Sequence, residues 1–373
     1  MKFLENVFDE MSSFEWLERS YRKARKQKRY RPEVLKFTAD LDTNLLDIQA
    51  QLREERFVFG PYRRHWVYVP KKRMVMALPF DSRVVQWAIY LTLKPFFAGL
   101  MIEDSYACLD GKGSLAAAQR LQYWLRLISN KPGDWYYLKI DISKYFYRVD
   151  HAILLEVLGR RIKDERLMRL IENIISCNGE KFGLPRFTSP DELPEDEWLD
   201  DVGMPIGNLT SQLFANIFLN ELDQFVKHKL HIRHYGRYMD DSIIVAPNKE
   251  DLNRHKDAIE EFLSTRLHLD LNRKTAIRPV EQPVEFVGYI ITASSLRLRK
   301  QTARRMKSAW HGICASYFAG ELSEAAFQRR RASYNGMIKH TDNAGLRQQM
   351  NEIYLLEKEK AKNDQDRTFG GAG

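Results

Sequence analysis

Cysteines are scarce in this chain, and long apolar runs are missing. Cys108, Cys177 and Cys314 are odd in number and too widely spaced for a metal site or a disulfide framework. No window approaches the roughly 18 apolar residues of a membrane-spanning helix. Acids occupy the N-terminal stretch where a signal peptide is apolar. We therefore expect a cytoplasmic protein with reduced cysteines and no membrane attachment.

Acidic residues are fewer than basic ones, so the formal net charge is +9. The excess is concentrated, with eight basic residues and no acid at 19–31 and six more basic residues at 296–307. Residues 191–201 carry seven acids instead, which indicates an exposed loop that stays away from nucleic acid. A solvated helix face would explain one basic cluster, but several clusters favour a phosphate backbone as the partner.

The motif Tyr-Met-Asp-Asp at 238–241 stands between two short apolar runs, as at the tip of a hairpin. Adjacent carboxylates repel each other, so they are costly unless they hold a cation. A third acid, Asp141, ends another apolar and aromatic run. Oxygen donors suit Mg²⁺, or Mn²⁺ in its place. We predict two ions, held by Asp141, Asp240, Asp241 and the carbonyl of Ile142, as nucleotidyl transfer requires.

Strand and helix patterns alternate along the chain, which predicts an α+β fold with an antiparallel sheet backed by helices. One strong helix is expected at 209–227, with Asn208 as its cap. The polar, glycine-ended tail at 363–373 is expected to be disordered.

With these acids and this order of elements, the chain resembles a reverse transcriptase from about residue 62 to residue 291. The resemblance implies a right-hand polymerase that copies RNA into DNA. Its partners would be template RNA, the RNA/cDNA duplex and deoxynucleoside triphosphates. The implied divisions are fingers at 1–133, with an N-terminal basic helical extension, and at 151–201, palm at 134–150 and 202–295, and thumb at 296–362.

The resemblance also implies roles for single residues. Lys71 and Arg73 would contact the triphosphate, Phe146 would exclude ribonucleotides, Lys274 would protonate pyrophosphate, and Gly288 would belong to the primer grip. Other nucleotide, primer and template contacts would come from Ile206, Gly207, Gln212, Tyr238, Met239 and the thumb cations Arg297, Arg299, Lys300, Arg304 and Arg305. Core packing, surface charge and a simple β-bulge are the alternatives for the aromatic, the cations and the glycine.

Two positions point to a subfamily. Most reverse transcriptases have Gln where Ile206 stands and Pro where Gln212 stands. The pattern here is similar to that of diversity-generating retroelements, although Leu109 replaces an Arg common among them. This similarity implies a bacterial or phage enzyme that makes errors chiefly at template adenines. It also implies cDNA that diversifies a target gene, and a pentameric accessory variability protein as partner.

Two other functions remain open at this stage. A stand-alone bacterial reverse transcriptase in phage defence would copy with ordinary fidelity. A non-catalytic RNA-binding scaffold is opposed by the intact acids Asp141, Asp240 and Asp241. A group II intron protein is less favoured, because the roughly 80 residues after the expected sheet suffice for a thumb but hardly for further domains.

Overall fold

The computed structural model describes residues 2–68 and 72–369. The chain contains two compact units. The first contains residues 1–113, 138–244 and 249–277, and the second contains residues 114–137, 245–248 and 278–373. No helix in the described ranges is long and apolar enough to cross a bilayer.

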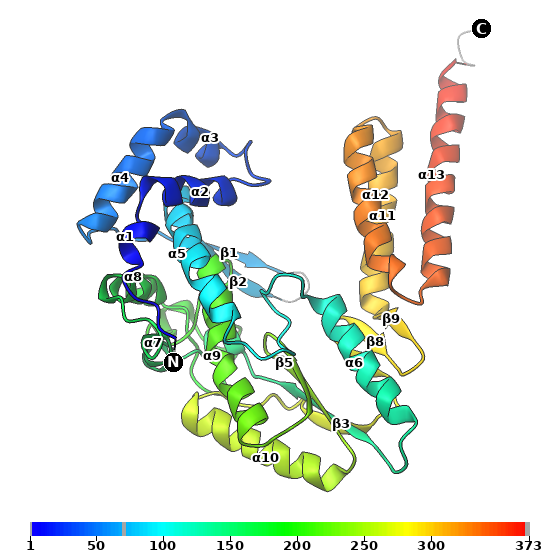
Figure 1. Cartoon of the computed structure of the whole chain (residues 1–373). Coiled ribbons are helices and arrows are strands. Elements are labelled where there is room, and N and C mark those ends of the chain that lie inside the picture. The colour runs from blue at the N-terminus through cyan, green and yellow to red at the C-terminus, as the bar shows by residue number, and fades with distance from the viewer. Residues whose placement is uncertain (1, 69–71, 370–373) are drawn as a thin grey trace. The chain divides into compact units, whose positions relative to one another are not determined.

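The first unit is a helical assembly around a small sheet (Figure 1). Its helices are α1 (Phe8–Met11), α2 (Phe14–Ala24), α3 (Pro32–Ala39), α4 (Leu41–Arg53), α5 (Phe80–Ala98), α7 (His151–Gly159), α8 (Glu165–Ile175), α9 (Leu209–His228) and α10 (Lys249–Arg266). Side chains cap several of them: Ser13, Asp150 and Asp164 accept backbone N–H groups at the starts of α2, α7 and α8. The long helices α5 and α9 pack against each other.

The strands of this part of the chain form two sheets. The strands are β1 (Arg63–Val67), β2 (Arg73–Ala77), β3 (Tyr136–Asp141), β4 (His234–Tyr238), β5 (Asp241–Ala246) and β6 (Ala276–Pro279). Antiparallel β1 and β2 pair Arg63 with Ala77 and Val67 with Arg73. The other strands follow the order β4-β5-β3-β6, so the predicted hairpin lies beside the strand that ends at Asp141. Short 3₁₀ turns cover Tyr145–Tyr147, Cys177–Gly179 and Glu195–Glu197.

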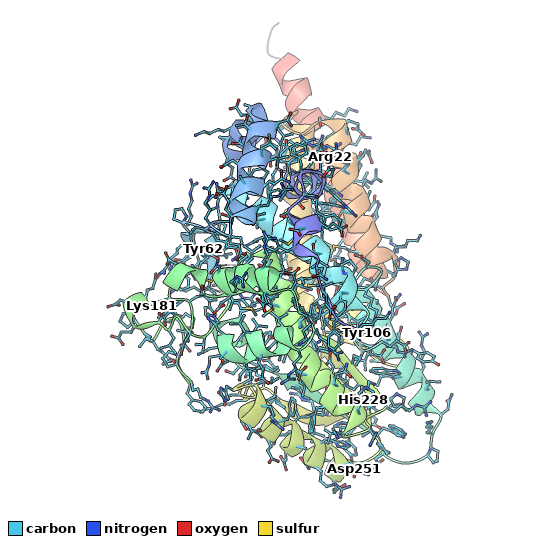
Figure 2. The ribbon with its side chains drawn as sticks, turned by 60° about the vertical axis from the view of Figure 1, so that its left-hand side comes forward. Arg22, Tyr62, Tyr106, Lys181, His228 and Asp251 are labelled. Carbon is cyan, nitrogen blue, oxygen red and sulfur yellow. The ribbon has the colours of Figure 1, made fainter. Side chains whose placement is uncertain are left out.

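The start of α9 differs from the prediction in one detail. Asn208 occupies the cap position but makes no side-chain cap bond. Its amide donates instead to the buried hydroxyl of Tyr62 at 3.0 Å, and Gln86 Oε1 accepts the Leu209 N–H at 3.2 Å. Tyr62 is labelled in Figure 2. A glutamine from α5 therefore takes over the cap, which no local sequence pattern could indicate.

The second unit joins one helix from the middle of the chain to the C-terminal third. Its elements are α6 (Ser114–Ser129), β7 (Val284–Phe286), β8 (Tyr289–Ile291), β9 (Leu296–Leu298), α11 (Lys300–Phe318), α12 (Glu324–Lys339) and α13 (Ala344–Phe369). The three strands form an antiparallel sheet on which α6 packs. The Trp310 indole donates to the Met350 carbonyl at 2.8 Å and ties α11 to α13.

The α+β fold class is confirmed. Helix α6, which the prediction places in the fingers, lies in the second unit, where Gln122 and Arg126 donate to the carbonyls of Thr292 and Ala293. Helix α13 extends to Phe369. Residues 370–373 lie outside the described ranges, and the division into fingers, palm and thumb stays a prediction.

Candidate functional site

The three predicted acids lie on neighbouring strands of the first unit. Asp141 is the last residue of β3, Asp240 lies in the turn between β4 and β5, and Asp241 is the first residue of β5. Because β5 is hydrogen-bonded to β3, the turn and the strand end are adjacent. Lys139 on β3 reaches Asp241 at 3.9 Å, and this half-exposed ion pair links the same two strands.

The pKa of Asp240 reflects both its burial and its charged neighbours. The pKa of Asp240 is raised to about 6, first because burial disfavours the charged carboxylate, then because Asp241 and Asp141 add negative charge. Arg73 opposes the shift, so its guanidinium is also within electrostatic reach of Asp240. The sheet thus gathers mutually repelling carboxylates, a repulsion that a bound cation would relieve.

The segment that follows α10 fixes the end of β3. The Asp141 carbonyl accepts from Asn272 N at 2.7 Å, and the Asp141 N–H donates to the Thr275 hydroxyl at 3.3 Å. Ser143 N donates to the Asp270 carbonyl at 2.8 Å. Lys274 is an exposed residue of this segment, so these bonds bring its backbone to the strand end that carries Asp141.

The oxygen donors of the site fit a hard divalent ion, but the side chains alone do not complete its coordination. Across the described residues, no group of three or more His, Cys, Asp or Glu side chains is arranged to hold a metal ion. Mg²⁺ usually binds through one or two carboxylates and keeps water and phosphate oxygens as its other ligands. Asp141, Asp240 and Asp241 are such carboxylates, and Ile142, which is buried and whose backbone forms an antiparallel bridge with Leu271, adds a carbonyl.

The predicted nucleotide contacts are placed as follows. Arg73 begins β2 and is exposed, whereas Lys71 lies outside the described residues. Phe146 sits half-buried in a 3₁₀ turn, 5.6 Å from the Tyr145 ring between centroids. Its carbonyl accepts from Met204 N at 2.7 Å, which joins the turn to the loop before α9. Phe146 therefore belongs to the same unit as the acids and is only partly used in packing.

The loop before α9 is attached to β2 by a close backbone contact. The Ile206 carbonyl accepts from Met76 N at 2.9 Å. Gly207 has φ +117°, and a Cβ there would lie 2.9 Å from Val75 Cγ1 and 3.0 Å from the Met76 carbonyl oxygen. Both conformation and space thus require glycine. Gln212 is exposed one turn into α9, and its amide oxygen accepts from the Cys108 thiol at 4.0 Å.

The turn itself is conformationally unusual. Tyr238 ends β4 and is half-buried, and Met239 follows with φ +53°. A left-handed conformation is unfavourable for a side chain with a Cβ, by roughly 1–2 kcal/mol. The surrounding structure must therefore hold the turn that presents Asp240 and Asp241.

The remaining predicted contacts belong to the second unit. Gly288 lies between β7 and β8 at φ +89°, with open space around its missing Cβ, so conformation alone calls for glycine. The Arg299 guanidinium donates to Glu285 at 2.8 Å in a surface ion pair, and its role as a phosphate contact stays a prediction. The other predicted thumb cations are exposed: Arg297, Lys300, Arg304 and Arg305.

The acidic segment at 191–201 is anchored and partly neutralised. Trp198 is buried, and its indole donates to the Leu193 carbonyl at 3.2 Å. Glu195 pairs with Arg64 of β1 at 3.3 Å, and Asp191 pairs with Lys72 beside β2. The expectation of an exposed loop is therefore incomplete, because this segment neutralises cations of the β1–β2 hairpin.

Sequence reasoning missed a buried polar group behind the turn. Arg237, Asp223 and Asn216 are nearly inaccessible to solvent, and Arg237 contacts both of the others. A usable signal exists: Asn216 and Asp223 are seven residues apart, on the face of α9 that also carries the apolar Leu219 and Val226. Arg237 in turn is a charge inside a strand. The pairing itself joins separate elements and has no local signature.

Comparisons with known proteins agree with this geometry. A family described as "Reverse transcriptase (RNA-dependent DNA polymerase)" matches residues 68–291. "Protein YkfC" of Escherichia coli K12 is 27% identical over 191 residues, covering 49% of this chain and 47% of that protein.

Two further matches cover more of the chain. "Group II intron-encoded protein LtrA" of Lactococcus lactis is 22% identical over 350 residues, covering 75% and 55%. A solved telomerase of Candida albicans, in complex with a fragment of telomeric RNA, has a TM-score of 0.45 and 11% identity, covering 83% and 58%. The chain thus spans about half the length of these curated relatives.

Proposed function

Because the chain belongs to the reverse transcriptase family, we propose that it is an RNA-directed DNA polymerase whose divalent-ion site is formed by Asp141, Asp240 and Asp241. The mixture of helices and antiparallel strands is the one predicted for a right-hand polymerase. The observation that supports the site best is the strand pairing: β5 lies beside β3, and Lys139 near the end of β3 reaches Asp241 at the start of β5 at 3.9 Å.

The proposed chemistry is attack of a primer 3′-hydroxyl on the α-phosphorus of a deoxynucleotide. A new P–O bond forms, and the bond to pyrophosphate breaks. Bound Mg²⁺ would activate the hydroxyl and stabilise the charge of the leaving group. Arg73 contributes positive charge on the side of Asp240, and Lys274 donates a proton to pyrophosphate. Phe146 excludes a ribose 2′-hydroxyl.

Primer extension on an RNA template tests the proposal. Asp240→Ala should abolish extension, because it removes one of the three carboxylates that are proposed to hold the ions in position. Asp257→Ala is the matched control, since Asp257 is an exposed acid on α10 whose ion pair with Lys256 lies at the surface. Full extension by Asp240→Ala would refute the site.

The finer proposal is that copying is error-prone at template adenines, for diversification of a protein gene with a pentameric accessory variability protein as partner. Ile206 supports it physically. This apolar residue stands in the loop fixed to β2, where a glutamine would offer hydrogen bonds. Weaker positioning of the incoming nucleotide lowers discrimination between bases.

Sequencing the cDNA tests this finer proposal. Wild-type product should carry substitutions concentrated at template adenines, and Ile206→Gln should reduce them. Leu35→Gln, an exposed position on α3, is the control for adding an amide. Errors spread evenly over the four template bases would instead favour a stand-alone reverse transcriptase of ordinary fidelity.

An intron-associated role is the second candidate, because curated relatives are named as intron proteins. A splicing assay with a group II intron RNA distinguishes it. Stimulation of splicing, together with cDNA free of adenine-clustered errors, would support this role over diversification.

A further inference from the structure

Arg237 is completely buried directly behind the acidic turn. Its Nε and Nη2 donate to the two carboxylate oxygens of Asp223 at 2.7 and 2.6 Å. Its Nη1 donates to Asn216 Oδ1 at 2.9 Å, and Nη2 also reaches the Asn216 carbonyl at 3.3 Å. A further bond runs from Nη1 to the Met239 carbonyl at 3.0 Å. Every nitrogen of the fork therefore has a partner.

A buried ion pair of this kind is not explained by stability alone. Both side chains of the Arg237–Asp223 pair are 0% exposed, so removing them from water costs much of what their attraction returns. Apolar residues of the same volume often serve a fold equally well. A hydrogen-bond network in which every donor has a partner, such as that of Arg237, instead holds its members in a fixed geometry.

This network holds the peptide that joins Met239 to Asp240. Met239 is left-handed, with φ +53°, and this peptide lies in the turn between the end of β4 and the start of β5. Arg237 binds the carbonyl of that peptide, whose nitrogen belongs to Asp240. We propose that Arg237 is a positioning residue: it sets this peptide and thereby directs the Asp240 carboxylate toward the divalent ion. The inference rests on the proposed function.

Arg237 is itself held from the opposite side. Its N–H donates to the Asp104 carbonyl and its carbonyl accepts from Tyr106 N, both at 2.9 Å. Tyr106 is labelled in Figure 2. The Asn216 amide donates to the Ala107 carbonyl at 2.9 Å, so the same loop is attached twice. A backbone anchored in this way can transmit the position of the guanidinium to the turn.

The network also provides a matched control. The Tyr235 hydroxyl donates to Asp223 Oδ1 at 2.7 Å, and Tyr235 is buried like Arg237. Tyr235→Phe removes one buried bond to the same carboxylate but leaves the bond from Arg237 to Met239. Arg237→Lys keeps the positive charge opposite Asp223 but lacks the fork that serves three partners at once.

The primary measurement is Mn²⁺ binding to the protein followed by EPR, which does not need turnover. Arg237→Lys should weaken binding by about tenfold or more, as expected for a residue that orients a ligand. The half-saturating Mg²⁺ concentration for extension should rise in parallel, with little change in KM for the deoxynucleotide at saturating Mg²⁺. Tyr235→Phe should bind Mn²⁺ like the wild type.

Wild-type ion affinity in folded Arg237→Lys, or an equal loss in Tyr235→Phe, would overturn the positioning role. If Arg237→Lys does not fold, Arg237→Met with Asp223→Leu retains volume without buried charge and should show the same loss of affinity. Failure of this double variant to fold, or normal Mn²⁺ binding by it, also overturns the role. A wild-type protein that neither binds Mn²⁺ nor extends a primer would overturn the proposed function instead.

Discussion

Neutralising Asp240 should stabilise the metal-free protein while removing its response to metal. A carboxyl whose pKa is raised in the folded state opposes folding when it is charged. For Asp240 this penalty is absent below the ordinary pKa of 3.8, grows as pH rises, and is complete above about 6. Asp240→Asn keeps the shape of the side chain and removes the charge.

The size of the effect follows from the pKa. A rise from 3.8 to about 6 corresponds to at most about 3 kcal/mol, because each pKa unit is about 1.4 kcal/mol. Solvent reaches part of the side chain, so we expect about 1–2 kcal/mol at pH 7.5 after allowance for screening. At pH 5 the carboxyl is largely protonated, and about half of the gain should remain.

Urea unfolding in EDTA, followed by circular dichroism, measures the gain, and Asp257→Asn on α10 controls for loss of an exposed acid. Adding Mg²⁺ should raise the midpoint for the wild type, because an ion that binds only the folded state stabilises it. The midpoint of Asp240→Asn should barely move. A variant less stable than the wild type in EDTA at pH 7.5 would refute the reasoning.

Three other changes test separate parts of the structure. Gly207→Ala should destabilise the protein by about 1–3 kcal/mol in urea unfolding, because φ is positive and β2 is in contact; Gly113→Ala, in open space, is the control. Phe146→Ala should raise the ratio of ribonucleotide to deoxynucleotide incorporation in single-nucleotide extension, and an unchanged ratio would assign this ring to packing. Neutralising three exposed cations of the predicted thumb, Lys300, Arg304 and Arg305, should weaken template–primer binding equally for all sequences. The slope of log affinity against log salt concentration should flatten by up to about 0.9 per lost phosphate contact. A loss of binding that depends on sequence would contradict contact with the phosphate backbone.

The positions of the three acids at a strand end and beside a tight turn were predictable, because local sequence patterns indicate strands and turns. Asp141 ends an apolar strand, Asp240 lies in a tight turn and Asp241 begins the next strand, so period and turn position sufficed. The long helix α9 followed from the same kind of pattern. Features set by pairing between distant segments were not predictable: α6 joins the C-terminal sheet, and Gln86 caps α9.

The acidic segment shows the same limit. Its composition predicted exposure, and most of its acids are indeed near solvent, but burial of Trp198 fixes the segment in place. Its partners Arg64 and Lys72 are more than a hundred residues away in sequence. Charge composition alone could therefore indicate what the segment avoids, but not which cations it neutralises.

Both unfavourable features of the site occur within two residues: a left-handed Met239 and a half-buried acid at 240 that is repelled by its neighbours. Neither is expected in a turn chosen for stability, since a glycine and a neutral side chain would avoid both costs. Sequences depart from local preference mainly where function requires it. Arg237 fits this view, because its buried fork binds the one carbonyl between these two features. The metal site proposed for the turn thus explains why two unfavourable residues occur there. The positioning role proposed for Arg237 explains how the peptide between them is held.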